Sequence, residues 1–97
     1  MSRSLHARQY VVSGRVQGVG FRWFVREQAQ SRRLAGFVEN APDGSVIAQV
    51  RGGAEALAAM ESAMRVGPPG ARVTQLDIRD LDEAVAASLP PRFEIRR

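Results

Sequence analysis

The chain has 97 residues, enough for one domain with a single buried core, and its 14 basic residues are all arginine, giving a formal net charge of +4. Because it has no cysteine and only one histidine, His6, it lacks the residues for disulfides, for common zinc sites and for cysteine or Ser-His-Asp catalysis. No segment is apolar enough for a signal peptide or a membrane span, so we expect a cytoplasmic protein with no membrane partner. The abundant arginine favours an anionic ligand.

Apolar periodicity and turn residues predict alternating strands and helices in one domain, 1–97, of which residues 1–6 are expected to be flexible. The first half of the chain is predicted to form a strand over 8–13, a glycine loop over 14–20, a helix over 21–34 and a strand over 36–40. A Pro-Asp-Gly turn then leads to a strand over 45–51, which two glycines at 52–53 are expected to break. The second half is predicted to form a helix over 54–66, a strand over 72–81, an undetermined connection over 82–91 and a short strand over 92–97.

The order β-α-β-β-α-β is typical of a ferredoxin-like α+β sandwich, with two helices on one face of an antiparallel sheet and here a short C-terminal strand added. In this topology the first and second strands run in the same direction, with another strand between them. Their C-terminal ends therefore lie on the same edge of the sheet. The sequence thus predicts that the loop Gly14–Gly20 and Asn40 are neighbours.

The stretch SGRVQGVGFR, residues 13–22, has three glycines just before a predicted helix. It is neither a Walker A loop, which needs lysine, nor a G-x-G-x-x-G fingerprint, nor a cysteine-based phosphatase loop. Glycines allow successive backbone N–H groups to turn toward an anion, and the helix N-terminus adds partial positive charge. Arg22 stands at that N-terminus, where a cation does not help the helix itself. An anion site and a plain tight turn with a solvated arginine both remain open on these features.

The segments VSGRVQGVGFRWFVREQA, GFVENAPDGSV and FEIRR resemble the acylphosphatase family along nearly the whole chain. The resemblance implies a single-domain hydrolase of small acyl phosphates that needs no metal or cofactor and binds inorganic phosphate or sulfate. We expect it to act as a monomer. Arg22 would bind the phosphate and Asn40 would position the attacking water. The backbone amides expected to cradle the phosphate are those of Arg15, Val16, Gln17, Gly18, Val19 and Gly20.

One residue departs from the family pattern: Glu39 precedes the asparagine, where the family often has a basic residue. Strand alternation sends Glu39 and Asn40 to opposite faces of the sheet, so the carboxylate need not touch the phosphate. Its charge would still lower anion affinity through space.

The remaining candidate residues have ordinary structural interpretations. Ser13 has no base beside it and is expected to be a strand residue. Side chains expected to pack in the core or along a helix are Trp23, Phe24, Met60 and Met64. The acidic residues expected to be solvated are Asp80, Asp82 and Glu83.

Two other functions compete with hydrolysis. Acylphosphatase-like domains also occur inside larger proteins that handle carbamoyl phosphate, so a non-catalytic binding module is one alternative. RNA-binding RRM domains share the β-α-β-β-α-β order, but they stack bases on aromatic residues of their central strands. Here Tyr10 is the only aromatic residue of the first strand, and SVIAQVR has none. Nucleic acid is therefore not expected as a partner.

Overall fold

The computed structural model describes residues 5–97 and contains a five-stranded sheet with three helices. The elements are β1 (Leu5–Arg15), α1 (Phe21–Ser31), β2 (Ala35–Asn40), β3 (Val46–Gly53), α2 (Ala54–Val66), β4 (Arg72–Asp80), α3 (Glu83–Ser88) and β5 (Glu94–Arg96). No helix in the described range is long and apolar enough to cross a membrane.

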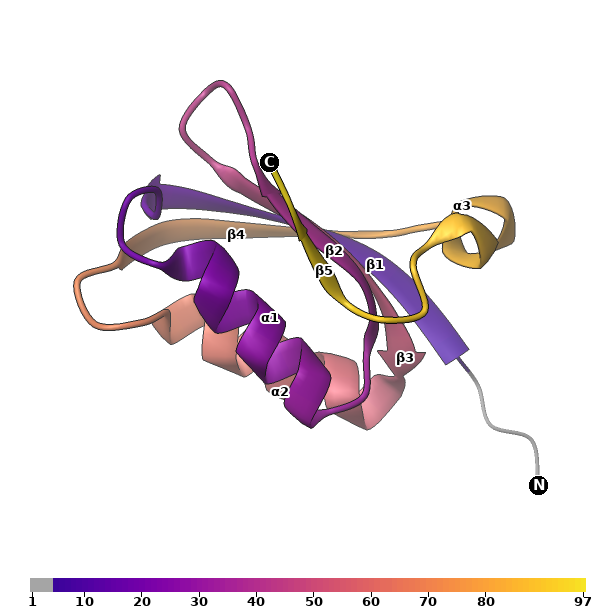
Figure 1. The fold of residues 1–97 in the computed structure, drawn as a ribbon. Coiled ribbons are helices and arrows are strands. Elements are labelled where there is room, and N and C mark those ends of the chain that lie inside the picture. The colour runs from indigo at the N-terminus through magenta and orange to yellow at the C-terminus, as the bar shows by residue number, and fades with distance from the viewer. Residues whose placement is uncertain (1–4) are drawn as a thin grey trace.

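The strand order in the sheet is β4-β1-β3-β2-β5, and the ferredoxin-like prediction is confirmed. Every neighbouring pair is antiparallel except β2 and β5, which are parallel, so the sheet is mixed rather than purely antiparallel. Figure 1 shows α1 and α2 on one face of the sheet, with α3 at the end of the molecule opposite the loop before α1.

The main core lies between the sheet and the two long helices. Most of its fully buried side chains come from β1, β2, β3, α1 and α2, and they include Tyr10, Val12, Val38, Val46, Phe21, Leu57, Met60 and Met64. Met60 and Met64 are core residues, as predicted, and Phe24 packs against the core as a partly buried side chain. A second, smaller cluster of Ala7, Phe37 and Leu89 occupies the other face of the sheet.

Several boundaries differ from those predicted. β1 starts at Leu5, earlier than expected, so Leu5 and His6 belong to a strand, while residues 1–4 of the segment expected to be flexible lie outside the described residues. Gly52 and Gly53 do not break β3, because they pair with His6 and Leu5 of β1. Helix α1 stops at Ser31, three residues short of the expected end.

The undetermined connection 82–91 contains a short helix, α3. Asp82 caps it, because its Oδ1 accepts a hydrogen bond of 2.9 Å from the backbone N–H of Val85. Leu89, just after this helix, is buried in the second cluster. The segment thus covers part of the face that α1 and α2 leave open.

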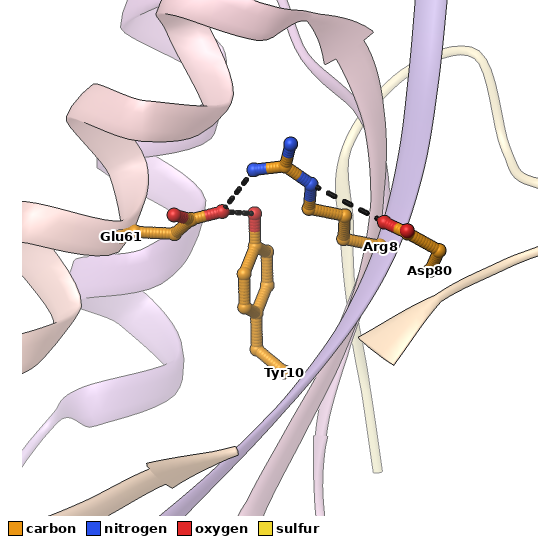
Figure 2. A network of polar contacts seen from close by, with 4 residues as sticks. All are labelled: Arg8, Tyr10, Glu61 and Asp80. Carbon is orange, nitrogen blue, oxygen red and sulfur yellow. Dashed lines mark hydrogen bonds and ion pairs between the residues drawn. The ribbon is translucent and has the colours of Figure 1, made fainter. Parts of the chain in front are cut away.

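A polar network joins α2 to the sheet (Figure 2). Glu61 on α2 accepts hydrogen bonds at Oε2 from the hydroxyl of Tyr10 (2.8 Å) and from a guanidinium nitrogen of Arg8 (2.5 Å). The Arg8 guanidinium also lies 3.6 Å from Asp80 at the end of β4. Burial raises the pKa of Tyr10 above its usual value, and the hydrogen bond to Glu61 raises it further.

Candidate active site

The topology brings the glycine loop and Asn40 together, as predicted. β1 and β2 each pair antiparallel with β3, so both strands run in the same direction and end at the same edge of the sheet. A cavity of about 190 Å³ at this edge is lined by Gly18 and Gly20 of the loop and by Asn40 at the end of β2. Pockets for drug-sized ligands measure ~300–1,000 Å³, so this cavity suits a smaller ligand.

The loop between β1 and α1 is shorter than the sequence suggested. Gly14 and Arg15 pair with β4 and continue β1, which leaves Val16–Gly20 as the loop. Gly14 has a φ of +119°, and a Cβ there would lie 2.1 Å from the carbonyl oxygen of Arg72. Only glycine fits this close approach of the two strands, which falls at the shift in register after Ser13. Ser13 is a strand residue, as expected.

Helix α1 begins without a side-chain cap. Gly20 occupies the N-cap position in the left-handed region (φ 77°), and its carbonyl accepts the first helical hydrogen bond from Phe24 at 2.9 Å. The backbone N–H groups of Phe21, Arg22 and Trp23 precede that bond and have no acceptor within the helix. The first helical turn also lacks an acidic residue. These N–H groups, at the positive end of the helix dipole, are therefore suited to an anion.

Arg22 adds a guanidinium to the lining of the cavity. One of its terminal nitrogens donates a 3.3 Å hydrogen bond to the backbone carbonyl of Arg96 in β5. Because β5 pairs with β2, this bond ties Arg22 to the strand beside the one that ends in Asn40. Two further residues from the C-terminal segment, Ile95 and Arg97, complete the wall on that side.

Asn40 is exposed and precedes a tightly bonded turn. In that turn, Asp43 Oδ1 accepts hydrogen bonds from the backbone N–H (2.9 Å) and the hydroxyl (2.6 Å) of Ser45. Both bonds hold the pKa of the Asp43 carboxyl below its usual value, and the bond from the Ser45 hydroxyl has the larger effect. Gln17 of the loop donates to the carbonyl oxygens of Ala41 and Ser45, so the loop and the turn are directly connected.

Of the six loop amides predicted to cradle phosphate, three belong to residues that line the cavity: Val16, Gly18 and Gly20. Arg15 lies within β1 opposite Arg72, Gln17 reaches the turn, and Val19 packs against the core. The sequence reasoning did not assign Phe21, Ile95 or Arg97 to the site, although they line it. The resemblance of FEIRR to the family was the one signal for the C-terminal residues.

Trp23 does not pack in the core, but it does pack along the flank of α1 against Arg26 of the same helix. Its side chain is 54% exposed, it lines the cavity, and the Arg26 guanidinium lies 3.9 Å from the centre of its ring.

Glu39 lies on the strand face opposite Asn40 and, among the described residues, is not part of the cavity wall.

Two of the three acidic residues Asp80, Asp82 and Glu83 have polar contacts within the domain. Asp80 lies near Arg8 and Asp82 caps α3. The side chains of Asp80, Asp82 and Glu83 are all exposed, as expected.

Within residues 5–97 no group of three or more histidine, aspartate or glutamate side chains is arranged to hold a metal ion. Tyr10, which an RRM would need on its open sheet face, is instead 0% exposed beneath the helices.

The structure is thus a ferredoxin-like domain with a small cavity lined by the glycine loop, the first turn of α1, Asn40 and the C-terminal segment, with Arg22 and Arg97 among the lining residues. A family model described as Acylphosphatase matches residues 8–95 of the chain. An acylphosphatase of Nitratidesulfovibrio vulgaris is 47% identical over 89 residues, which cover 92% of this chain and 88% of the relative.

Solved structures agree. The crystal structure of acylphosphatase from Bacillus subtilis matches with a TM-score of 0.85 at 36% identity, covering 97% of this chain and 100% of that chain. Full-length HypF, in a phosphate- and nucleotide-bound form, matches with a TM-score of 0.84 at 26% identity over 100% of this chain but 12% of its own. The chain belongs to the acylphosphatase family, and it is a hydrolase of acyl phosphates.

Proposed function

We propose that the protein cleaves the bond between phosphorus and the acyl oxygen of small acyl phosphates by direct attack of water, without a metal ion. The phosphate would sit in the cavity between the loop Val16–Gly20 and the start of α1. The water would be positioned by Asn40. The products would be a carboxylate and inorganic phosphate.

The observation that carries this proposal is the uncapped N-terminus of α1 beside a guanidinium. Phe21, Arg22 and Trp23, whose N–H groups have no acceptor within the helix, all line one small cavity. In phosphoryl transfer, negative charge is spread over three equatorial oxygens, and catalysis depends mainly on placing the reactants and stabilising that charge. Fixed amides and a guanidinium supply both functions.

Asn40 lines the same cavity, so a water bound to its side chain would lie beside a phosphate held there. An asparagine carbonyl accepts a hydrogen bond from water and orients it, but it is too weak a base to keep a proton. As the water oxygen bonds to phosphorus, the acyl oxygen leaves with its electron pair as a carboxylate. The water proton goes to a phosphate oxygen, which balances the reaction.

The test is the hydrolysis of acetyl phosphate in EDTA by wild type, Arg22→Ala and Asn40→Ala. Loss of the guanidinium in Arg22→Ala should lower kcat/KM on the order of 10²-fold or more, comparable to the loss of one oxyanion donor. Asn40→Ala should chiefly lower kcat, while inhibition by inorganic phosphate stays near the wild-type value. Arg79→Ala is the matched control, because Arg79 is an exposed arginine of β4 outside the cavity wall.

Wild-type turnover in Arg22→Ala would refute the phosphate-binding role of Arg22. A large loss of phosphate inhibition in Asn40→Ala would make Asn40 a phosphate ligand instead of a water-positioning residue. Complete dependence of the wild type on an added metal would contradict the metal-free mechanism.

Two further parts of the proposal concern the protein in the cell. The cavity has lining residues from the loop, α1, β2 and the C-terminal segment of one chain, which supports action as a monomer. The many arginines and the lack of cysteine are compatible with a cytoplasmic location. Sedimentation at working concentration and cell fractionation test these two statements.

A further inference from the structure

The side chain of Gln17 connects two parts of the site that are far apart in the sequence. Its Nε2 lies 2.8 Å from the carbonyl oxygen of Ala41 and 2.9 Å from that of Ser45. An amide nitrogen has two hydrogens, and here each has its own acceptor. Because both partners are carbonyl oxygens, the amide must present its nitrogen and not its oxygen to the turn.

The two acceptors also hold the turn itself together. The backbone N–H of Ala41 donates to the Ser45 carbonyl at 2.8 Å, and that of Gly44 donates to the Ala41 carbonyl at 3.1 Å. Ser45 is only 6% exposed, so its carbonyl is attached to a well-packed part of the chain. Gln17 therefore binds a closed turn that begins at the residue directly after Asn40.

The two halves of the site are anchored differently on their own. The loop is held to the core by Val16, which is 1% exposed, and by the partly buried Val19. Asn40, in contrast, is the last residue of β2 to pair with β3, and its side chain is exposed. Loss of the Gln17 side chain should therefore displace Asn40 and its turn more than the phosphate loop.

We propose that the Gln17 side chain is a positioning residue that holds the turn after Asn40 against the phosphate loop. It fixes where the water stands relative to the phosphorus. This rests on the proposed function, since it assigns Gln17 a part in the same reaction. A shift of about 1 Å in the placement of reacting groups can lower a rate by ~10²-fold. Loss of the two hydrogen bonds of Gln17 should therefore lower kcat measurably.

The first test replaces Gln17 with methionine, which has a similar length but no hydrogen-bond donor. Gln17→Met should lower kcat by roughly 10- to 100-fold. KM and the inhibition constant of inorganic phosphate should stay within about twofold, as expected for sites that are not coupled. Gln49→Met is the matched control, because Gln49 also donates a side-chain bond (2.9 Å, to Gln9) but lies outside the cavity wall. Its kcat should equal that of wild type.

The second test separates positioning from general destabilisation. If Gln17 acts through Asn40, then Gln17→Met should cost less than about twofold in kcat once Asn40→Ala is already present. An equal loss in both backgrounds would overturn the proposal, as would a loss of phosphate affinity as large as the loss of kcat. Gln17→Asn, whose side chain is too short to reach both carbonyls, serves if the methionine variant does not fold and should give the same pattern.

Failure of the positioning role of Gln17 can be distinguished from failure of the proposed function. If wild type does not hydrolyse acyl phosphates, the proposed function fails, and hydrogen exchange still tests the contact. The amides of Ala41 and Gly44 should exchange faster in Gln17→Met than in wild type or Gln49→Met. Unchanged exchange at both amides would show that Gln17 does not hold the turn and would overturn the inference.

Discussion

Asp43 shows at the scale of a single residue how the turn beside Asn40 responds to pH. Its carboxylate accepts two hydrogen bonds from Ser45, which hold its pKa below the usual value of 3.8. Since the folded-state pKa is lowered, the stabilisation is present above the unfolded pKa and is lost as the pH falls through the folded one. We therefore expect Asp43→Ala to lower the urea midpoint by a constant amount above about pH 5, with the difference from wild type narrowing below about pH 4. A difference that widens in acid would contradict this assignment.

The backbone topology alone predicts that the elements carrying Arg22 and Asn40 meet at one edge of the sheet, whereas the roles expected for these two residues rest on the resemblance to the acylphosphatase family. The contacts of the Gln17 side chain could not be predicted, because its bonds reach carbonyl groups 24 and 28 residues away, whose positions depend on the finished turn. Core packing is a wrong prediction for Trp23, because the helical period places this residue away from the buried face of α1. It lies two positions from both Phe21 and Val25, which places it on the opposite side of α1 from these buried side chains.

At the scale of elements, the network in Figure 2 fastens α2 to β1 and β4. Glu61→Ala would leave the buried Tyr10 hydroxyl without an acceptor, so we expect a loss of ~1–3 kcal/mol in the free energy of unfolding. The kcat should be unchanged, because neither residue lines the phosphate cavity. Urea unfolding and acetyl phosphate kinetics on the same preparations measure both.

A double-mutant cycle provides the control for this element-scale prediction. Tyr10→Phe removes the hydroxyl that donates to Glu61. It should therefore lower the free energy of unfolding less in the Glu61→Ala background than in wild type. Additive losses would mean that the Tyr10 hydroxyl and the Glu61 carboxylate do not stabilise each other.

The long elements could be predicted because their apolar periods are clear, whereas the short ones depend on tertiary contacts. α3 has six residues, too few for a helical period, and its stability comes from the Asp82 cap and the burial of Leu89. The strand at Gly52 and Gly53 continues because β1 begins early enough to pair with them. Local sequence gave no indication that β5 would pair parallel to β2.

At the scale of the whole molecule, the strand order explains why so small a domain can hold this site. Placing β3 between β1 and β2 brings the ends of two parallel strands to one edge, and β5 adds the carbonyl that Arg22 binds. The core lies between the sheet and the two long helices, away from this edge. The start of α1 and the end of β2 therefore bring Arg22 and Asn40 to one cavity, which favours a reaction that depends on positioning.

The central claim is that water attacks phosphorus directly, without a metal ion. The most direct measurement is the hydrolysis of acetyl phosphate by wild type in EDTA, in water enriched in the heavy oxygen isotope, with analysis of both products after a single turnover. We expect rapid hydrolysis with the heavy oxygen in inorganic phosphate and none in acetate. Heavy oxygen in acetate would mean that water attacks the carbonyl carbon, and no turnover in EDTA would mean that a metal is required. Either result would exclude metal-free attack of water on phosphorus.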